Sequence, residues 1–227
     1  MIEKQEGFFM SDTYKALFEA MRAKCQREHW YGPDCSNPKQ YEDILTYDPN
    51  FDRHTLEVEL APADDPKRFG FVFPPASEEQ LQEAEARIGF SLPPLLRAMY
   101  ANVANGGFGP GLGLYGVLNG YKGGYLNSDS TISEQHPEGT FDYTTYQEHA
   151  AQAVTRGERS HMAVPYGQWL QHLLRLSDLG CCEEACVDNQ ERMFIVAPLE
   201  NNDEYGLFQL PWNLEEWLWR WVKDEQY

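Results

Sequence analysis

The chain has 227 residues, of which 42% are hydrophobic and 14% aromatic, and this composition excludes wholesale disorder. Its 36 acidic residues outnumber 18 basic ones, and the formal net charge of −18 disfavours binding to nucleic acid and anionic lipid. The acidity suits a basic protein partner, with solubility alone as the alternative explanation. No stretch approaches the roughly 18 continuous apolar residues of a membrane span, and the N-terminus lacks a secretory signal, so we expect a cytoplasmic protein.

The first 70 residues are expected to form an extension of the main domain. An apolar stripe at helical spacing predicts a helix over residues 11–29, and alternation predicts a strand over residues 54–60. The stripe consists of Tyr14, Leu17, Phe18, Met21 and Cys25. Because the apolar content of residues 1–70 is too thin for a separate core, we expect this helical and irregular segment to pack on a domain formed by residues 71–227.

Two short helices are predicted next. Ser77 with Gln80 three residues later forms a capping box, and Gly89 is placed to end that helix in the left-handed conformation. Pro94 suits the first turn of a second helix, which Asn105 and the two following glycines stop. Residues 108–117 mix glycine with Leu and Tyr, a pattern that favours a turn feeding a strand.

The second half of the chain predicts a helix, a strand meander and a final helix. Thr144 or Thr145 can cap the first of these helices, and Asn213 with Glu216 forms a capping box for the last. The predicted strands cover residues 173–177, 181–187, 192–197 and 207–210. Short strands joined by polar turns indicate an α+β fold, with an antiparallel or mixed central sheet and helices packed largely on one side.

Several of these segments resemble the SUKH superfamily, which includes the Smi/Knr-type regulators of fungal cell-wall assembly and many bacterial immunity proteins. The resemblance rests on Gly89, the Leu92-Pro93-Pro94 step, the glycine-rich run 103–111, Trp169 with Leu173-Leu174, the run 177–181, Val187-Asp188 and the run 214–218. Leu170 stands where the family often has proline, and Leu179 where it often has tryptophan. The resemblance covers about residues 71–227.

The resemblance implies a non-enzymatic protein-binding module, in bacteria often an immunity protein. Such a protein neutralises a cognate toxin by occluding its surface, and a basic nuclease toxin would suit the charge of this chain. A regulatory scaffold without a toxin partner is the alternative that the fungal relatives imply. A metal-dependent enzyme is the third alternative.

The search for catalytic chemistry in the sequence gives no catalytic residue and no cofactor. The glycine run 107–113 lies between a predicted helix and a predicted strand, and no lysine follows it before Lys122, so we expect close backbone packing and not a phosphate cradle. No nucleophile stands in a GxSxG turn. Paired carboxylates are too abundant in this chain for any one pair to indicate acid–base catalysis.

The cysteines give no assigned metal site. Cys181, Cys182 and Cys186 have poor geometry for a tetrahedral site along a strand, and we expect them to be buried structural residues. Cys25, His29 and Cys35 form a looser set without a fourth ligand, and whether they bind a metal stays open at this point.

Carboxylates of the predicted meander are the first candidates for contact with a basic partner. They are Glu183, Glu184, Asp188, Glu191, Glu200, Asp203 and Glu204. Trp219, which lies off the main apolar stripe of the final helix, is a candidate aromatic anchor, with packing against residues 1–70 as the alternative. The oligomeric state and the identity of the partner do not follow from the sequence.

Overall fold

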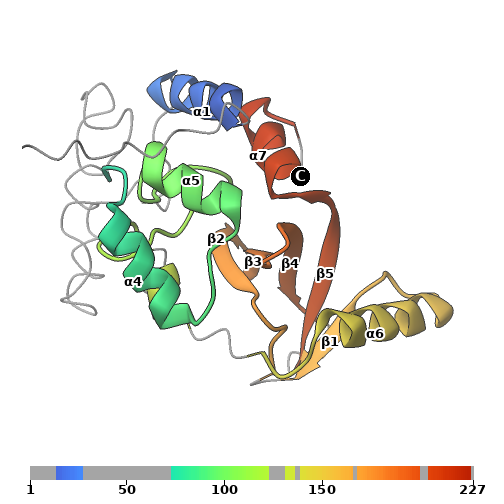
Figure 1. Cartoon of the computed structure of the whole chain (residues 1–227). Helices are drawn as coiled ribbons and strands as arrows, with labels where there is room; N and C mark the ends of the chain where they lie inside the picture. Colours follow the sequence, from blue (N-terminus) through green and yellow to red (C-terminus); the bar gives the residue numbers. More distant parts are fainter. Residues whose placement is uncertain are drawn as a thin grey trace, which may run out of the picture.

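The computed structural model describes residues 14–27, 73–122, 131–135, 139–165, 168–199 and 204–225 (Figure 1). The helices are α1 (Lys15–Arg27), α4 (Glu78–Ile88), α5 (Pro94–Asn102), the short 3-10 helix η3 (Ile132–Glu134), α6 (Tyr143–Thr155) and α7 (Leu214–Val222). The strands are β1 (Met162–Pro165), β2 (Leu174–Gly180), β3 (Glu183–Val187), β4 (Arg192–Pro198) and β5 (Glu204–Asn213). These elements confirm the predicted α+β fold.

One antiparallel sheet holds the five strands in the order β1-β5-β4-β3-β2. Strands β2 to β5 form the predicted meander, in which each strand pairs with the next along the chain. Strand β1 pairs with the first half of β5 and places Met162 opposite Leu207. The sequence did not predict β1, since it is only four residues long and ends in Pro165, a residue that cannot donate to a sheet.

Alternation along the strands divides the interior into two cores. Ala185 and Val187 of β3 face the main core, whereas Cys186 between them faces a second one. Helices α1, α4, α5 and α7 bury their apolar residues in the main core, and α6 covers the opposite face through Tyr146 and Ala150 (Figure 1). Four of the five α-helices that the structure describes therefore lie on one side of the sheet, as predicted.

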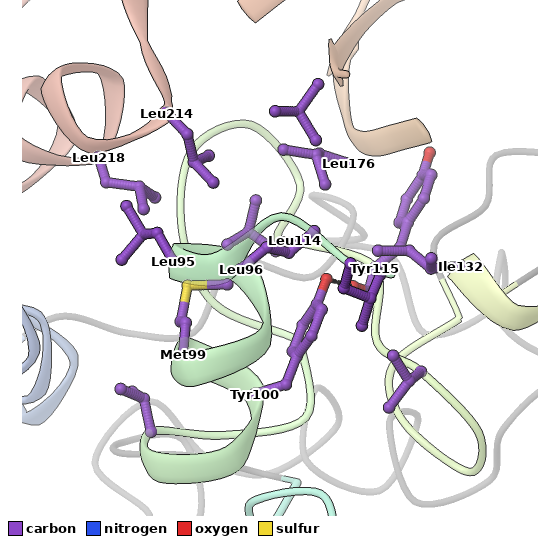
Figure 2. Close-up of a cluster of buried hydrophobic side chains, with 14 of the residues drawn as sticks. Leu95, Leu96, Met99, Tyr100, Leu114, Tyr115, Ile132, Leu176, Leu214 and Leu218 are labelled. Atoms are coloured by element: carbon purple, nitrogen blue, oxygen red, sulfur yellow. Dashed lines mark hydrogen bonds between the residues drawn. The ribbon is translucent and has the colours of Figure 1, made fainter. Parts of the chain in front are cut away.

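Helix α5 is the centre of the main core (Figure 2). Its residues Leu95, Leu96, Met99 and Tyr100 are all fully buried, and the Tyr100 hydroxyl donates a hydrogen bond to the backbone carbonyl of Tyr115. Burial without ionising partners raises the pKa of Tyr100 well above its ordinary value, so it remains a neutral donor. This bond holds the glycine-rich segment against α5.

Helix α1 belongs to the same core. Leu17, Phe18 and Met21 are buried in it, and α1 lies alongside α7 (Figure 1). The ammonium group of Lys24 there pairs with Asp224. The predicted strand over residues 54–60 lies outside the described residues. The division into an extension of residues 1–70 and a domain of residues 71–227 stays a prediction.

The predicted helix caps are confirmed at α4 and α7 and corrected at α6. Both capping boxes form, and Gly89 ends α4 with a φ of +83°. Helix α6 is capped by Asp142 and not by Thr144 or Thr145, because the Asp142 carboxylate accepts hydrogen bonds from both the backbone N–H and the hydroxyl of Thr145.

The strand predicted within residues 108–117 does not form. Glycines with positive φ recur through this segment, so it cannot extend as a strand, and it meets β2 through isolated backbone bonds from Leu112 to Asp178 and from Tyr115 to Leu176. A Cβ on Gly111 would lie 2.3 Å from the carbonyl oxygen of Asp178. The glycines therefore serve close packing, as predicted, and the segment covers the edge of β2.

Candidate protein-binding surface

The hairpin of β2 and β3 brings two carboxylates face to face at one end of the sheet. Asp178 on β2 is the cross-strand partner of Glu184 on β3, and exposed Glu183 lies opposite Gly180 next to the hairpin loop. Like charges directly opposite one another repel, so this pairing is electrostatically unfavourable by itself.

Glu184 is partly neutralised by one arginine. Its Oε2 atom lies 3.2 Å from Nε of Arg175, and its side chain is 21% exposed to solvent. Burial raises the pKa of Glu184 above its ordinary value, and Asp178 raises it further, whereas Arg175 lowers it. The guanidinium of Arg175 also lies over the ring of Trp169, 5.1 Å from its centroid. Arg175 thus contacts a carboxylate and an aromatic ring at once.

Strand pairing through β4 places the start of β5 at this same end of the sheet. Glu184 pairs with Val196 on β4, and two residues further along β4 Pro198 pairs with Tyr205. Tyr205 is 41% exposed, although it shares a strand face with buried Leu207, so alternation alone predicts it inside. We call Asp178, Glu183, Glu184 and Tyr205 the hairpin end.

Asp188 and Glu191 lie at the other end of β3 and take part in the fold. Asp188 is 1% exposed, and its carboxylate accepts hydrogen bonds from the backbone N–H groups of Gln190 and Arg192 and pairs with the Arg192 guanidinium. Glu191 joins two helices to this turn: its Oε1 atom accepts from the N–H of Leu95, and its carbonyl accepts from that of Leu214.

The predicted partner-binding residues therefore do not gather in one patch. Glu183 and Glu184 lie at the hairpin end, where β5 begins with Glu204, whose side chain lies outside the described residues together with Glu200 and Asp203. Trp219 is half-buried on α7, packs partly on the main core and has the Lys223 ammonium 5.6 Å from its ring centroid.

The expectation of buried cysteines is correct for one of three. Cys186 is buried in the second core, and burial raises its thiol pKa well above the ordinary value, with Glu184 adding to the effect. Cys181 and Cys182 are exposed, because the strand predicted from residue 181 starts at Glu183 and leaves both cysteines in the hairpin loop. A loop position, unlike a strand position, gives their side chains no core to enter.

The described part of the chain contains neither a metal-binding cluster of three or more ligands nor a helix that could span a membrane. No group of three or more His, Cys, Asp or Glu side chains within it could hold a metal ion. Cys25 is buried on α1, while His29 and Cys35 lie outside the described residues. Across those same ranges, every helix is too short or too polar to cross a membrane.

Comparison with protein-family models gives a match over most of the chain. The model of the SMI1 / KNR4 family (SUKH-1) matches residues 75–220, which run from the cap of α4 into α7 and include the whole sheet. Searches of curated proteins and of solved structures gave no match. Helix α1 lies before the matched residues although it shares their core. Since the match covers well over half of the 227 residues, the chain belongs to the SMI1/KNR4 (SUKH-1) family.

Proposed function

We propose that the protein is a non-enzymatic binding module that neutralises a basic toxin by occluding its surface. Family membership supports this proposal, because immunity proteins are among the members that the sequence resembles. The observation that carries it at the level of the site is the pairing of Asp178 with Glu184 beside exposed Glu183. Arg175 pairs with Glu184 there, and a cationic partner would relieve the repulsion between Glu184 and Asp178.

The rest of the molecule favours attraction of the same kind of partner. A net charge of −18 on 227 residues attracts a basic protein over distances of about 10 Å at ordinary salt and raises the association rate. Tyr205 adds an exposed aromatic ring at the same end of the sheet as the carboxylates, and tyrosine is a residue type that contributes strongly to interfaces. Binding would then cover the partner's functional surface without any chemical step.

Recovery of the partner tests this proposal. The tagged full chain is used to capture proteins from its native host, and the variant E183K/E184K is used in parallel. The matched control E19K/E83K makes the same change in net charge on exposed residues of α1 and α4. We expect the wild type and the control to retain one basic protein whose toxicity or enzymatic activity falls on binding, and the hairpin variant to lose it.

Two outcomes would contradict the proposal. A retained partner that is acidic or without any inhibitable activity would favour a regulatory scaffold. Equal loss of the partner in the hairpin variant and in the control would mean that total charge, and not the hairpin end, determines binding. Circular dichroism of all three proteins checks that each variant keeps the fold.

A further inference from the structure

The two-residue loop between β2 and β3 consists of adjacent exposed cysteines. Gly180 pairs with Glu183 across the hairpin, so Cys181 and Cys182 are the only loop residues, and both thiols are unbonded. The other two cysteines in the described part of the chain, Cys25 and Cys186, are buried. Cysteine is among the most buried residue types, and an exposed pair is unusual for a purely structural role.

The backbone of this loop does not favour cysteine. Cys181 and Cys182 have φ values of +50° and +66°, and positive φ at both loop positions is characteristic of a type I′ turn. Asn-Gly is the preferred pair in such a turn, because other residues are strained in the left-handed conformation. The cysteines thus occupy positions that hairpin formation alone would give to Asn and Gly.

The adjacency of the two cysteines in the chain favours a shared ligand over a disulfide. Adjacent Cα atoms are about 3.8 Å apart across a trans peptide, whereas disulfides usually join Cα atoms about 4.4–6.8 Å apart. A direct bond between the two sulfurs would therefore be strained and easily reduced. A metal ion placed between the sulfurs lengthens the bridge and removes this constraint.

We propose that Cys181 and Cys182 form a two-coordinate site for a soft monovalent metal ion, with Cu(I) as the defining example. Thiolates select soft ions, and Cu(I) accepts two sulfur ligands, while a structural Zn²⁺ site requires four. On binding, each thiol releases its proton, and the ion is held by two thiolates with no change in oxidation state. The proposal is independent of the toxin-binding function, since it uses only these two side chains.

Competition with a chromophoric Cu(I) chelator, bicinchoninate, tests the site in the reduced full chain under anaerobic conditions. We expect the wild type to remove about one equivalent of Cu(I) from its bicinchoninate complex. The apparent affinity for Cu(I) should increase as pH rises, because binding releases protons. The variant C181N/C182G installs the preferred turn pair and should lose this equivalent while keeping the fold. C181N and C182G alone should each weaken binding at least about tenfold, because a two-coordinate site needs both sulfurs.

Three results would overturn the proposal. The first is equal withdrawal of Cu(I) by the wild type and by C181N/C182G, which would place the ion elsewhere. The second is failure of the wild type to compete at all. The third is a stoichiometric Zn²⁺ complex that depends on the same two cysteines, which would contradict the proposed class of ion. Circular dichroism and the unfolding midpoint of C181N/C182G distinguish loss of the site from loss of the fold.

Discussion

Glu191 accepts a hydrogen bond from the backbone N–H of Leu95, at 2.9 Å between Oε1 and N, across 96 positions of the chain. Helix α5 begins after Pro93, which offers no side-chain cap, so this carboxylate supplies the missing acceptor from the β3–β4 turn. A negative charge near a helix N-terminus is also favourable for the helix dipole. One side chain thus joins the sheet to the central helix of the main core.

Loss of this acceptor should destabilise the fold. Glu191→Ala removes the bond to Leu95, and we expect the free energy of unfolding to fall by about 1 kcal/mol, the typical value of a helix cap. Glu191→Gln keeps an acceptor oxygen and should lose less. Urea unfolding of both variants measures the difference, and equal stability of Glu191→Ala and the wild type would contradict the assigned role.

Asp188 should contribute more to the stability of the fold than Glu191. Asp188→Ala leaves the partly buried Arg192 guanidinium and two backbone N–H groups without their acceptor, and we expect a loss of about 3 kcal/mol. Asp188→Asn keeps an acceptor for both N–H groups, so its free energy of unfolding should lie between those of Asp188→Ala and the wild type. Chemical denaturation gives the three values, and a surface charge without a structural role would instead show changes within about 0.5 kcal/mol.

Glu184 should make stability fall as pH rises. Burial raises its folded pKa above the ordinary 4.5, so between these two values the folded state holds a proton that the unfolded state has released. Stability contributed by the protonated form is therefore present below pH 4.5 and lost as pH rises through the raised pKa. Glu184→Gln removes this titration. Unfolding midpoints from pH 4 to pH 7 should decline less for Glu184→Gln than for the wild type, and parallel curves would contradict the assignment.

The loop variant C181N/C182G should stabilise the protein. Each replaced cysteine has positive φ, a conformation that costs about 1–2 kcal/mol in an ordinary L-residue and less in Asn or Gly. Part of the gain is offset because glycine loses more backbone entropy on folding, so we expect a net increase of about 1 kcal/mol. Thermal unfolding of the metal-free proteins measures it, and a lower melting temperature would show that the loop is not a strained type I′ turn.

Two glycines with positive φ offer a matched test of packing. A Cβ at Gly111 meets a backbone carbonyl at 2.3 Å, whereas one at Gly89 has nothing within 4 Å. Gly89→Ala should lose about 1 kcal/mol from left-handed strain alone. Gly111→Ala should lose about 1–3 kcal/mol more because of the overlap. Denaturant unfolding measures both losses. Equal losses of unfolding free energy in Gly89→Ala and Gly111→Ala would mean that the glycine-rich segment does not pack tightly on β2.

Local patterns in the sequence predicted much of the fold. The Ser77–Gln80 and Asn213–Glu216 capping boxes and the strand meander depend on neighbouring residues, and they form as expected. The roles of Asp188 and Glu191 were missed for two different reasons. The Asp188–Arg192 pair is close in sequence but becomes buried only when the sheet folds, and the partner of Glu191 lies 96 positions away.

The candidate surface was only partly predictable. Glu183 and Glu184 follow from the predicted strands, but the pairing of Glu184 with Asp178 depends on a register that shifts at bulges in β2. Exposure of Tyr205 contradicts simple alternation, since Leu207 on the same strand face is buried in the second core. Strand β1 is too short for its residues to show the alternating pattern of a strand. In the sequence, Cys181 and Cys182 look like the start of the next strand, which begins at Glu183.

The association rate of the captured partner tests the central claim most directly. Stopped-flow mixing compares E183K/E184K with E19K/E83K at low and at high salt. If the hairpin end attracts a basic partner, E183K/E184K should associate at least about tenfold more slowly than the control at low salt, and the difference should shrink at high salt. Equal rates for the two variants at low salt would contradict the claim that the hairpin end is the binding surface.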